Sequence, residues 1–578
     1  MAFPGRRVID DGLGRSSYSR RNRLSMLEPA PSEPAALIAF VMIHAMDFRG
    51  AEGGAMLTDE RWRYRMTEDD LRMFRQLVRD DHPLRLALER IPWESFRATL
   101  EAYYHEKLGQ PAIDPVRMLK LEFLRYQYNL SDRQVIEHCE TDLSFRYFLQ
   151  VGCNFRLPDA SLLTRFRGRL GAEGFQKIFQ QLVALARAAG LVKDRLRLKD
   201  ASHVIADIAI PTALQLVAQA RDQLLAAAEP WDAEAVAGHH INSQLLRERT
   251  KNLPDDQRLA ARVTHLQEIL AWAEQIAAPP ALDEADAVTQ RAWQRLVWVR
   301  DVTRKILFDQ AHPDAGRRTL SVFDPEARRG KHGEWYEGYI VDILMDADSE
   351  LITEVNTLQA GGDEAKDAVE LVAREQATHG NQIEAFSIDG AGFNGEMLRA
   401  IEDPEQGLGI TTYVPPKTEP THGRFTPADF TKSEDDSHVT CPAGQPSRYR
   451  QRDSDDHGYL YRFTRAQCDG CPLAQQCVAK PGQGAFGRTV QKSDYEAEYR
   501  RARERATTAA YAAVRSEHAA VERKLNEVLN HHDGRHARYW GRAKVHAQEC
   551  MTCFTVNVKR MVKLLTSTSE SACAPAVG

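Results

Sequence analysis

The feature that most constrains the fold is a strand pattern that stops, gives way to a long helical block, and then resumes. Residues 194–210 have the β-branched, alternating pattern of a strand. Residues 212–310 are rich in Ala, Leu, Gln, Glu and Arg and poor in β-branched residues, which favours helices broken at three proline-containing sites. Strand patterns return at 334–345 and 350–356. We therefore expect a helical insertion of three helices, at 212–310, within a β-containing domain.

The residues after the insertion alternate between helix and strand patterns. They predict a helix at 364–378, a strand at 383–389, a helix at 394–401 and a strand at 409–414. This mixed order predicts an α/β domain, built from 191–211 and 311–414, with helices packed on a central sheet.

The N-terminal part is predicted to be a flexible lead at 1–57 followed by an all-α domain at 58–190. In that domain, one helix opens at Ser131 and a second opens after Leu157, capped by Asp159 or Ser161. The pair has helix-turn-helix character, and its second helix could enter a DNA groove. The alternative is an ordinary helical bundle with solvated arginines. The candidate DNA contacts on the second helix are Arg165, Arg167 and Arg169.

Three acidic residues are candidate metal ligands. Asp200 lies inside the first strand on its apolar side, where a carboxylate is costly unless it is paired or metal-bound. Asp389 ends a later strand, just before a glycine-rich turn, where α/β sheets bind ligands. The alternatives are a salt bridge of Asp200 with Arg195 or Lys199, and a turn-capping role for Asp389.

The third acid, Glu522, lies on a predicted late helix that carries Tyr511 and Arg515 on the same face. Glu517 is its competitor, and a surface salt bridge is the alternative role. Carboxylates from two strands and a helix that meet at one point suit hard divalent cations and two-metal phosphodiester chemistry. Arg515 is a candidate to orient Glu522 or to hold a phosphate.

Four cysteines lie in a loop-rich segment, 415–500. They have the spacing C-x26-C-x2-C-x5-C, which suits tetrahedral Zn²⁺ and predicts a structural zinc-ribbon-like insertion. An iron–sulfur cluster or four unpaired thiols are the alternatives. The four are Cys441, Cys468, Cys471 and Cys477. A second C-x2-C pair, Cys550 and Cys553, lies in a helical pattern and is expected to pack in a core.

The net charge of −6 argues against a surface that is basic all over, yet two segments are locally basic. One is the N-terminal stretch 6–23. The other interleaves cations with aromatics, which suits phosphate and base contacts. It consists of Arg535, Arg538, Tyr539, Trp540, Arg542 and Lys544. The longest apolar run, 35–46, is too short to cross a bilayer, so a cytoplasmic protein is expected.

Several motifs together resemble the DDE transposases of bacterial insertion sequences, in the branch with an insertion-sequence-five-like N-terminal domain. The carriers of this resemblance run from about residue 58 to 565. They include Leu130-Ser-Asp-Arg-Gln-Val, Leu157-Pro-Asp-Ala-Ser-Leu, Lys199-Asp-Ala-Ser-His-Val, Ser387-Ile-Asp-Gly-Ala-Gly-Phe393, Val521-Glu-Arg-Lys, Arg538-Tyr-Trp-Gly and Asn557-Val-Lys-Arg560. Tyr511 and Arg515 lie farther from Glu522 than the family's signature spacing, and Leu529 stands where the family has lysine.

The resemblance implies an RNase H-like catalytic domain with Asp200, Asp389 and Glu522 as the triad that binds Mg²⁺ or Mn²⁺. It implies a transposase that binds terminal inverted repeats, cleaves the element ends and joins them to target DNA. A homodimer or higher assembly on nucleoid DNA is expected. The alternatives are a nuclease without strand transfer and an inactive, zinc-stabilised DNA-binding remnant. Residues 501–565 would hold the glutamate helix and a basic C-terminal helix, and 566–578 a disordered tail.

Overall fold

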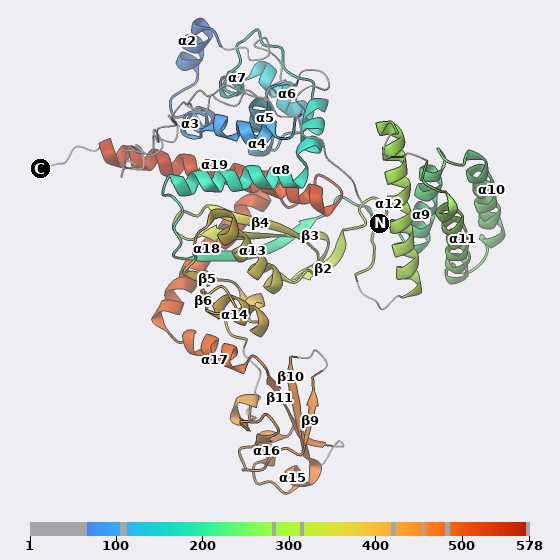
Figure 1. Ribbon diagram of the computed structural model, residues 1–578, viewed down its shortest axis with the longest axis vertical. Coiled ribbons are helices and arrows are strands. Elements are labelled where there is room, and N and C mark those ends of the chain that lie inside the picture. Colours follow the sequence, from blue (N-terminus) through green and yellow to red (C-terminus); the bar gives the residue numbers. More distant parts are fainter. Residues whose placement is uncertain are drawn as a thin grey trace, which may run out of the picture.

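A computed structural model describes residues 66–573 except 105–111, 280–281, 283–284, 313–316, 418–423, 454–456 and 480–485. The predicted flexible lead, the basic stretch 6–23 and the apolar run 35–46 lie outside the described residues. The centre of the molecule is a six-stranded sheet (Figure 1). Its strands are β1 (Arg197–Ile205), β2 (Arg328–His332), β3 (Glu334–Asp346), β4 (Ile352–Gln359), β5 (Ala385–Ser387) and β6 (Thr411–Tyr413).

The sheet is mixed. β3 pairs antiparallel with β1 along one edge, and with β2 and then β4 along the other. β5 pairs parallel with β1, and β6 parallel with β5. The predicted strands are confirmed as an α/β arrangement; the sequence reading missed β2, a short run of mostly charged residues.

Helices cover both faces of this sheet (Figure 1). One core joins Leu198 and Val204 of β1 to α8, α18 and α19. The other joins Phe386 of β5 to α13 and α14. Because both faces are buried, the strands are rich in large apolar residues. The covering helices are α8 (Ser161–Ala188), α13 (Glu364–His379), α14 (Gly395–Glu402), α17 (Glu496–Arg505), α18 (Ala509–Asn526) and α19 (Arg542–Cys573).

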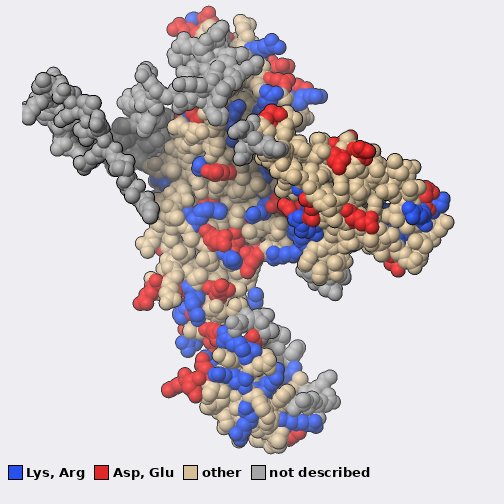
Figure 2. Space-filling model, turned by 45° about the vertical axis from the view of Figure 1, so that its right-hand side comes forward, with Lys and Arg blue, Asp and Glu red and all other residues tan. Residues whose placement is uncertain are grey.

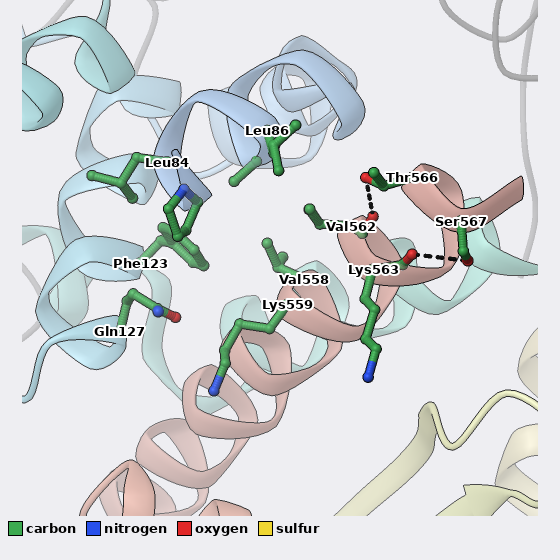
Figure 3. Close-up of a pocket in the computed structure, with 12 residues that line it drawn as sticks. Leu84, Leu86, Phe123, Gln127, Val558, Lys559, Val562, Lys563, Thr566 and Ser567 are labelled. Atoms are coloured by element: carbon green, nitrogen blue, oxygen red, sulfur yellow. Dashed lines mark hydrogen bonds between the residues drawn. The ribbon is translucent and has the colours of Figure 1, made fainter. Parts of the chain in front are cut away.

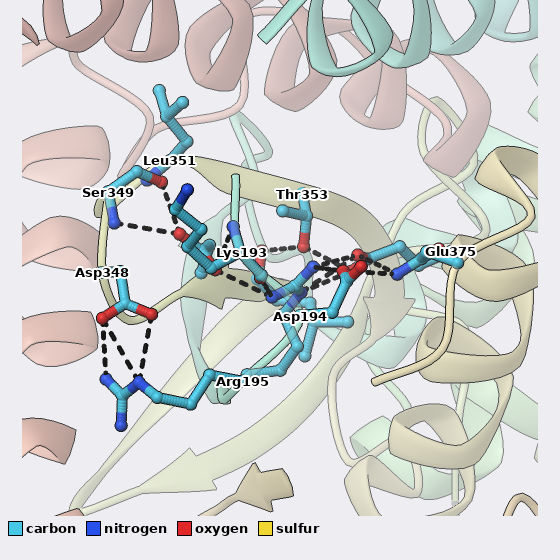
Figure 4. A network of polar contacts seen from close by, with 12 residues as sticks. Lys193, Asp194, Arg195, Asp348, Ser349, Leu351, Thr353 and Glu375 are labelled. Carbon is cyan, nitrogen blue, oxygen red and sulfur yellow. Dashed lines mark hydrogen bonds and ion pairs between the residues drawn. The ribbon is translucent and has the colours of Figure 1, made fainter. Parts of the chain in front are cut away.

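Charged side chains anchor β1 inside the domain (Figure 4). Arg197 is fully buried and pairs with Glu375 of α13 at 2.7 Å and with Asp346 of β3 at 2.9 Å. Lys199 pairs with Asp342 at 2.8 Å. Removing one partner of such a buried pair typically costs about 3–5 kcal/mol, so these pairs fix the strand that carries Asp200.

The N-terminal domain is helical, as predicted. Ser131 caps its helix through a reciprocal capping box with Gln134. The helix-turn-helix prediction needs correction, because α7 lies between the two helices that were expected to be neighbours. The elements are α2 (Glu68–Leu77), α3 (Pro83–Arg90), η1 (Trp93–Phe96), α4 (Arg97–Glu101), α5 (Pro115–Gln127), α6 (Asp132–Thr141) and α7 (Leu143–Leu149).

The insertion after β1 forms its own bundle with its own core, set to one side of the sheet (Figure 1). Its described residues contain four long helices and not the three expected, because each of the three proline breaks separates two helices. They are α9 (Ala213–Ala228), α10 (Ala233–Thr250), α11 (Asp255–Gln275) and α12 (Ala287–Ala311).

The cysteine-rich segment forms a lobe at the far end of the molecule, between β6 and α17 (Figure 1). A three-stranded sheet in the order β11–β10–β9 is its main element. The lobe contains η4 (Pro427–Asp429), β7 (Thr431–Lys432), β8 (Val439–Thr440), β9 (Tyr449–Arg452), β10 (Gly458–Thr464), α15 (Arg465–Asp469), α16 (Ala474–Cys477) and β11 (Phe486–Ser493).

The C-terminal helix is longer than predicted. α19 continues through Cys573, so residues 566–573 are helical and not part of a disordered tail. Within the described residues, no helix is both long and apolar enough to span a bilayer.

Candidate active site

Asp200 and Asp389 are brought together by strand pairing. β5 runs parallel to β1, with Arg197 opposite Phe386 and Leu198 opposite Ser387. β5 ends at Ser387, and the same offset, continued past the paired residues, corresponds to Asp200 opposite Asp389. Asp389 also accepts a hydrogen bond from the Ala391 backbone at 3.0 Å, so its turn-capping role is present as well.

The surroundings of Asp200 disfavour its charged form. Burial raises the pKa of Asp200 to about 6, and the negative charges of Asp389 and Glu522 act in the same direction. Arg195 and Lys199, the two possible salt-bridge partners, are paired elsewhere, with Asp348 and Asp342. A cation bound between the three carboxylates would relieve both their mutual repulsion and the desolvation of Asp200.

The structure separates the two candidate glutamates of α18. Glu517 is held by Arg195 at 2.6 Å. Glu522 is exposed, and its charge acts on Asp200. Among the described residues, Glu522 forms no ion pair with an arginine, and its negative charge acts to raise the pKa of Asp200.

Arg515 binds to the strand end that carries Asp389. It donates to the Ile388 carbonyl at 2.9 Å and to Ser387 Oγ at 3.2 Å. His518, one turn along α18, lies against the same hydroxyl at 3.2 Å, and burial lowers the pKa of this histidine to about 4. Sequence reasoning missed Ser387 and His518, for which the only signal was the helical spacing of His518 from Arg515.

Most side chains of the predicted basic turn, residues 535–544, contact other parts of the protein. Arg535 donates to the His203 carbonyl at 2.9 Å and to Ser202 Oγ, two residues beyond Asp200. Trp540 donates its indole N–H to the Asp207 carbonyl at 2.9 Å. Arg538 lies over the Tyr126 ring. Two further members of the turn, Arg542 and Lys544, are exposed.

Tyr539 joins this turn to the N-terminal domain. Its hydroxyl accepts a hydrogen bond from Arg125 at 2.5 Å. Arg125 and Arg167 both pair with Glu122, at 2.9 and 2.7 Å, so Arg167 belongs to an internal network. By contrast, Arg165 and Arg169 are exposed. The three arginines of α8 are therefore not equivalent as candidate DNA contacts.

The four cysteines of the lobe gather in one place. Burial raises the pKa of Cys468 and of Cys477, and Cys441 and Cys471 act on both in the same direction. Cys468 Sγ lies where a side chain at Gly487 would be, since a Cβ there would approach it to 2.4 Å. Cys550 and Cys553, as expected, are buried in the core of α19.

Neither the three acidic residues nor the four cysteines form a complete metal-coordination shell. Among the described residues, no three histidine, cysteine or acidic side chains are placed closely enough to hold a metal as they stand. The donor chemistry nevertheless fits: three carboxylates with mutual repulsion suit Mg²⁺, and four neighbouring thiols suit Zn²⁺. A mostly apolar groove between α3, α5 and α19 is lined by none of these candidate ligands (Figure 3).

Two family models match the chain. Residues 72–169 match a transposase domain of the DUF772 type. Residues 440–562, which include Glu522 and all four lobe cysteines, match a transposase DDE domain. Both matches support an insertion-sequence DDE transposase. A DDE transposase domain implies an RNase H-like fold. In this structure Asp200 lies on β1, and Asp389 follows the end of β5.

One curated relative is an uncharacterised protein, ORF8 in the nfe locus of Rhizobium meliloti. It is 28% identical over 109 residues, which cover 18% of this chain and 50% of the relative. The chain thus spans about half the length of the curated relative that it matches. No solved structure matches the chain.

Proposed function

We propose that this protein is a metal-dependent DNA transposase that binds the terminal inverted repeats of its element, cleaves the element ends and joins the 3′ ends to target DNA. The observation that carries the proposal is the environment of Asp200, where burial raises the pKa to about 6 and the charges of Asp389 and Glu522 act in the same direction. The matches to two transposase domains support it independently.

Asp200, Asp389 and Glu522 would hold Mg²⁺ or Mn²⁺. Such ions supply activation of an attacking oxygen and stabilisation of a leaving oxygen in phosphodiester chemistry. The protein's own contribution would be placement: the parallel strands β1 and β5 lead to the two aspartates, and α18 carries the glutamate. Arg515 acts as a positioning residue, because its hydrogen bonds hold the strand end next to Asp389.

DNA contacts are proposed on exposed cations near this centre. Arg165 and Arg169 on α8, and Arg542 and Lys544 at the start of α19, are exposed and suited to phosphates. Arg167, Arg535, Arg538 and Tyr539 have internal partners and are proposed to shape the binding surface from behind. Assembly as a dimer or higher oligomer on DNA is part of the same proposal.

In the lobe, Cys441, Cys468, Cys471 and Cys477 would hold a structural Zn²⁺. The lobe's apolar core is small, consisting of side chains such as Phe430, Val439 and Tyr461, so a metal would add the stability that the core lacks.

The test uses purified full-length protein, a DNA fragment carrying the element ends, a target plasmid and Mg²⁺. Nicks at the ends followed by joined products are expected. Cleavage without joined products would identify a nuclease, and binding without cleavage would identify an inactive DNA-binding remnant; either result would overturn the proposal. The Asp200→Asn protein should produce neither nicks at the element ends nor joined products.

A further inference from the structure

The outer face of the three-stranded sheet in the cysteine-rich lobe carries two exposed aromatic side chains. Tyr449 of β9 is 55% exposed and Phe486 of β11 is 40% exposed. The two rings lie 5.8 Å apart at an interplanar angle of 75°. Large aromatic rings exposed side by side on a folded sheet mark a surface with a binding role more often than isolated exposed residues do.

Strand register defines this face. Arg462 of β10 lies opposite Tyr449 on one side and opposite Thr489 on the other, so the three side chains share a face. The neighbouring β10 residues, Tyr461 and Phe463, point to the opposite face and are buried in the lobe core. The aromatic face is thus directed away from the lobe core.

Cations lie among the rings. The Arg462 guanidinium lies 5.1 Å from the centre of the Phe486 ring. Arg448, next to Tyr449 in sequence, is exposed. Arg450 alternates to the opposite face, where it lies over the Tyr459 ring and donates to the Asp436 carbonyl at 2.8 Å. Lysine and arginine side chains gather on this lobe in the space-filling view (Figure 2). One acid borders the face, since Asp453 accepts a hydrogen bond from Gln491 at 2.6 Å.

This combination selects one class of ligand. Exposed rings that alternate with guanidinium groups bind single strands, because any base can stack on a ring while the cations neutralise the backbone. In duplex DNA the bases are stacked on each other and their faces are not available. A sheet face with such rings is also a known platform for unstacked bases.

We propose that the outer face of the lobe sheet, centred on Tyr449, Phe486 and Arg462, binds unpaired bases of single-stranded DNA. The choice of DNA over RNA rests on the proposed function, whereas stacking on the two rings does not. The site is separate from the three acids, so it gives the protein a hold on a melted or freed strand that is independent of the cutting centre.

The test measures binding of a fluorescein-labelled oligo(dT) of 20 nucleotides to full-length protein, with Ca²⁺ in place of Mg²⁺. The Tyr449→Ala/Phe486→Ala double variant should bind at least tenfold more weakly, given about 1–3 kcal/mol per stacked base. Binding of a duplex of the same length should change less than threefold. Phe308→Ala, which removes an equally exposed ring on α12, is the matched control and should bind oligo(dT) like the wild type.

Unchanged oligo(dT) affinity in the double variant, or an equal loss for duplex, would overturn the proposal. So would at least tenfold tighter binding of oligo(U) than of oligo(dT). If the double variant does not fold, photo-crosslinking of wild-type protein to an iodouracil-substituted DNA strand decides: adducts on Tyr449 or Phe486 are expected, and adducts confined to other elements contradict the site. Loss of end cleavage with intact oligo(dT) binding would sink only the transposase proposal.

Discussion

The negative charge of Asp389 adds to the burial that raises the pKa of Asp200 to about 6. Asp389 follows β5, which runs parallel to β1, the strand that carries Asp200. Two carboxylates so placed repel each other, and burial of Asp200 adds to the cost of its charge. The arrangement disfavours the charged form of Asp200 in the metal-free protein, which is the basis of the proposed cation site.

The first prediction follows from this repulsion. Asp200→Asn should stabilise the metal-free protein, by about 1–3 kcal/mol at neutral pH, since a pKa raised from 3.8 to about 6 means that the charged form is penalised in the fold. Thermal unfolding without divalent ions measures the effect. An Asp200→Asn protein that is less stable than wild type without metal would show that the carboxylate has a favourable partner.

The second prediction concerns Arg515. Arg515→Ala removes both hydrogen bonds to the end of β5 and should reduce strand transfer ten- to a hundredfold, roughly the cost of a 1 Å misplacement. Affinity for end DNA should be unchanged, because the role is positioning. Arg500→Ala, on the exposed side of α17, is the control. A loss of DNA affinity equal to the loss of rate would assign Arg515 to phosphate binding instead.

The third prediction concerns zinc in the lobe. Gly487→Ala should weaken Zn²⁺ retention at least tenfold, because the new methyl group would occupy the space of Cys468 Sγ. Gly470→Ala is the matched control, since nothing lies within 4 Å of its added Cβ. Zinc content after dialysis against a weak chelator measures retention. Equal zinc retention in the two variants would mean that the protein binds zinc elsewhere or does not bind it.

The fourth prediction is a pH dependence of stability. Although burial acts in the opposite direction, the positive charges of Lys524 and Lys559 lower the pKa of Glu527 to about 2. A folded pKa below the unfolded value of about 4.5 gives stability that is present above pH 4.5 and is lost as pH falls toward 2. Ionised Glu527, held by the two lysines, should therefore contribute up to about 3 kcal/mol to the free energy of unfolding.

Urea unfolding of wild type and Glu527→Gln between pH 3 and 7 checks this contribution. The difference between the two proteins should shrink steadily below pH 4.5. A difference that stays constant down to pH 3 would mean that Glu527 titrates normally and that the lysine contacts add little.

The fifth prediction concerns the contact between the N-terminal helical domain and the turn before α19. Tyr539→Phe removes the hydroxyl that accepts from the buried Arg125 and should cost about 1–2 kcal/mol of unfolding free energy. No cost would indicate that Glu122 alone satisfies Arg125.

The sequence was enough to predict the α/β core and the placement of Asp200 inside a strand, because each is a local pattern. The zinc site of the four cysteines stays a prediction. It could not separate Glu522 from Glu517, since both lie near the buried side of one helix. The distinction depends on Arg195, which is distant in sequence and pairs with Glu517.

The basic residues show the same limit. Arg165, Arg167 and Arg169 follow one another on a helix and look alike in sequence. Only the fold shows that Arg167 turns inward to Glu122, and that Tyr539 meets Arg125 across more than four hundred residues. The predicted number of helices in the insertion was wrong for a simpler reason. Three proline-containing breaks divide a helical segment into four helices, not three.

The most direct test of the central claim compares Glu522→Gln with Glu517→Gln in strand transfer with Mg²⁺. Both variants change one carboxylate to an amide on the same helix. We expect Glu522→Gln to form at least a thousandfold less joined product than the wild type, whereas Glu517→Gln should stay within about tenfold of wild-type activity. Full activity in Glu522→Gln, together with loss in Glu517→Gln, would contradict the proposed site.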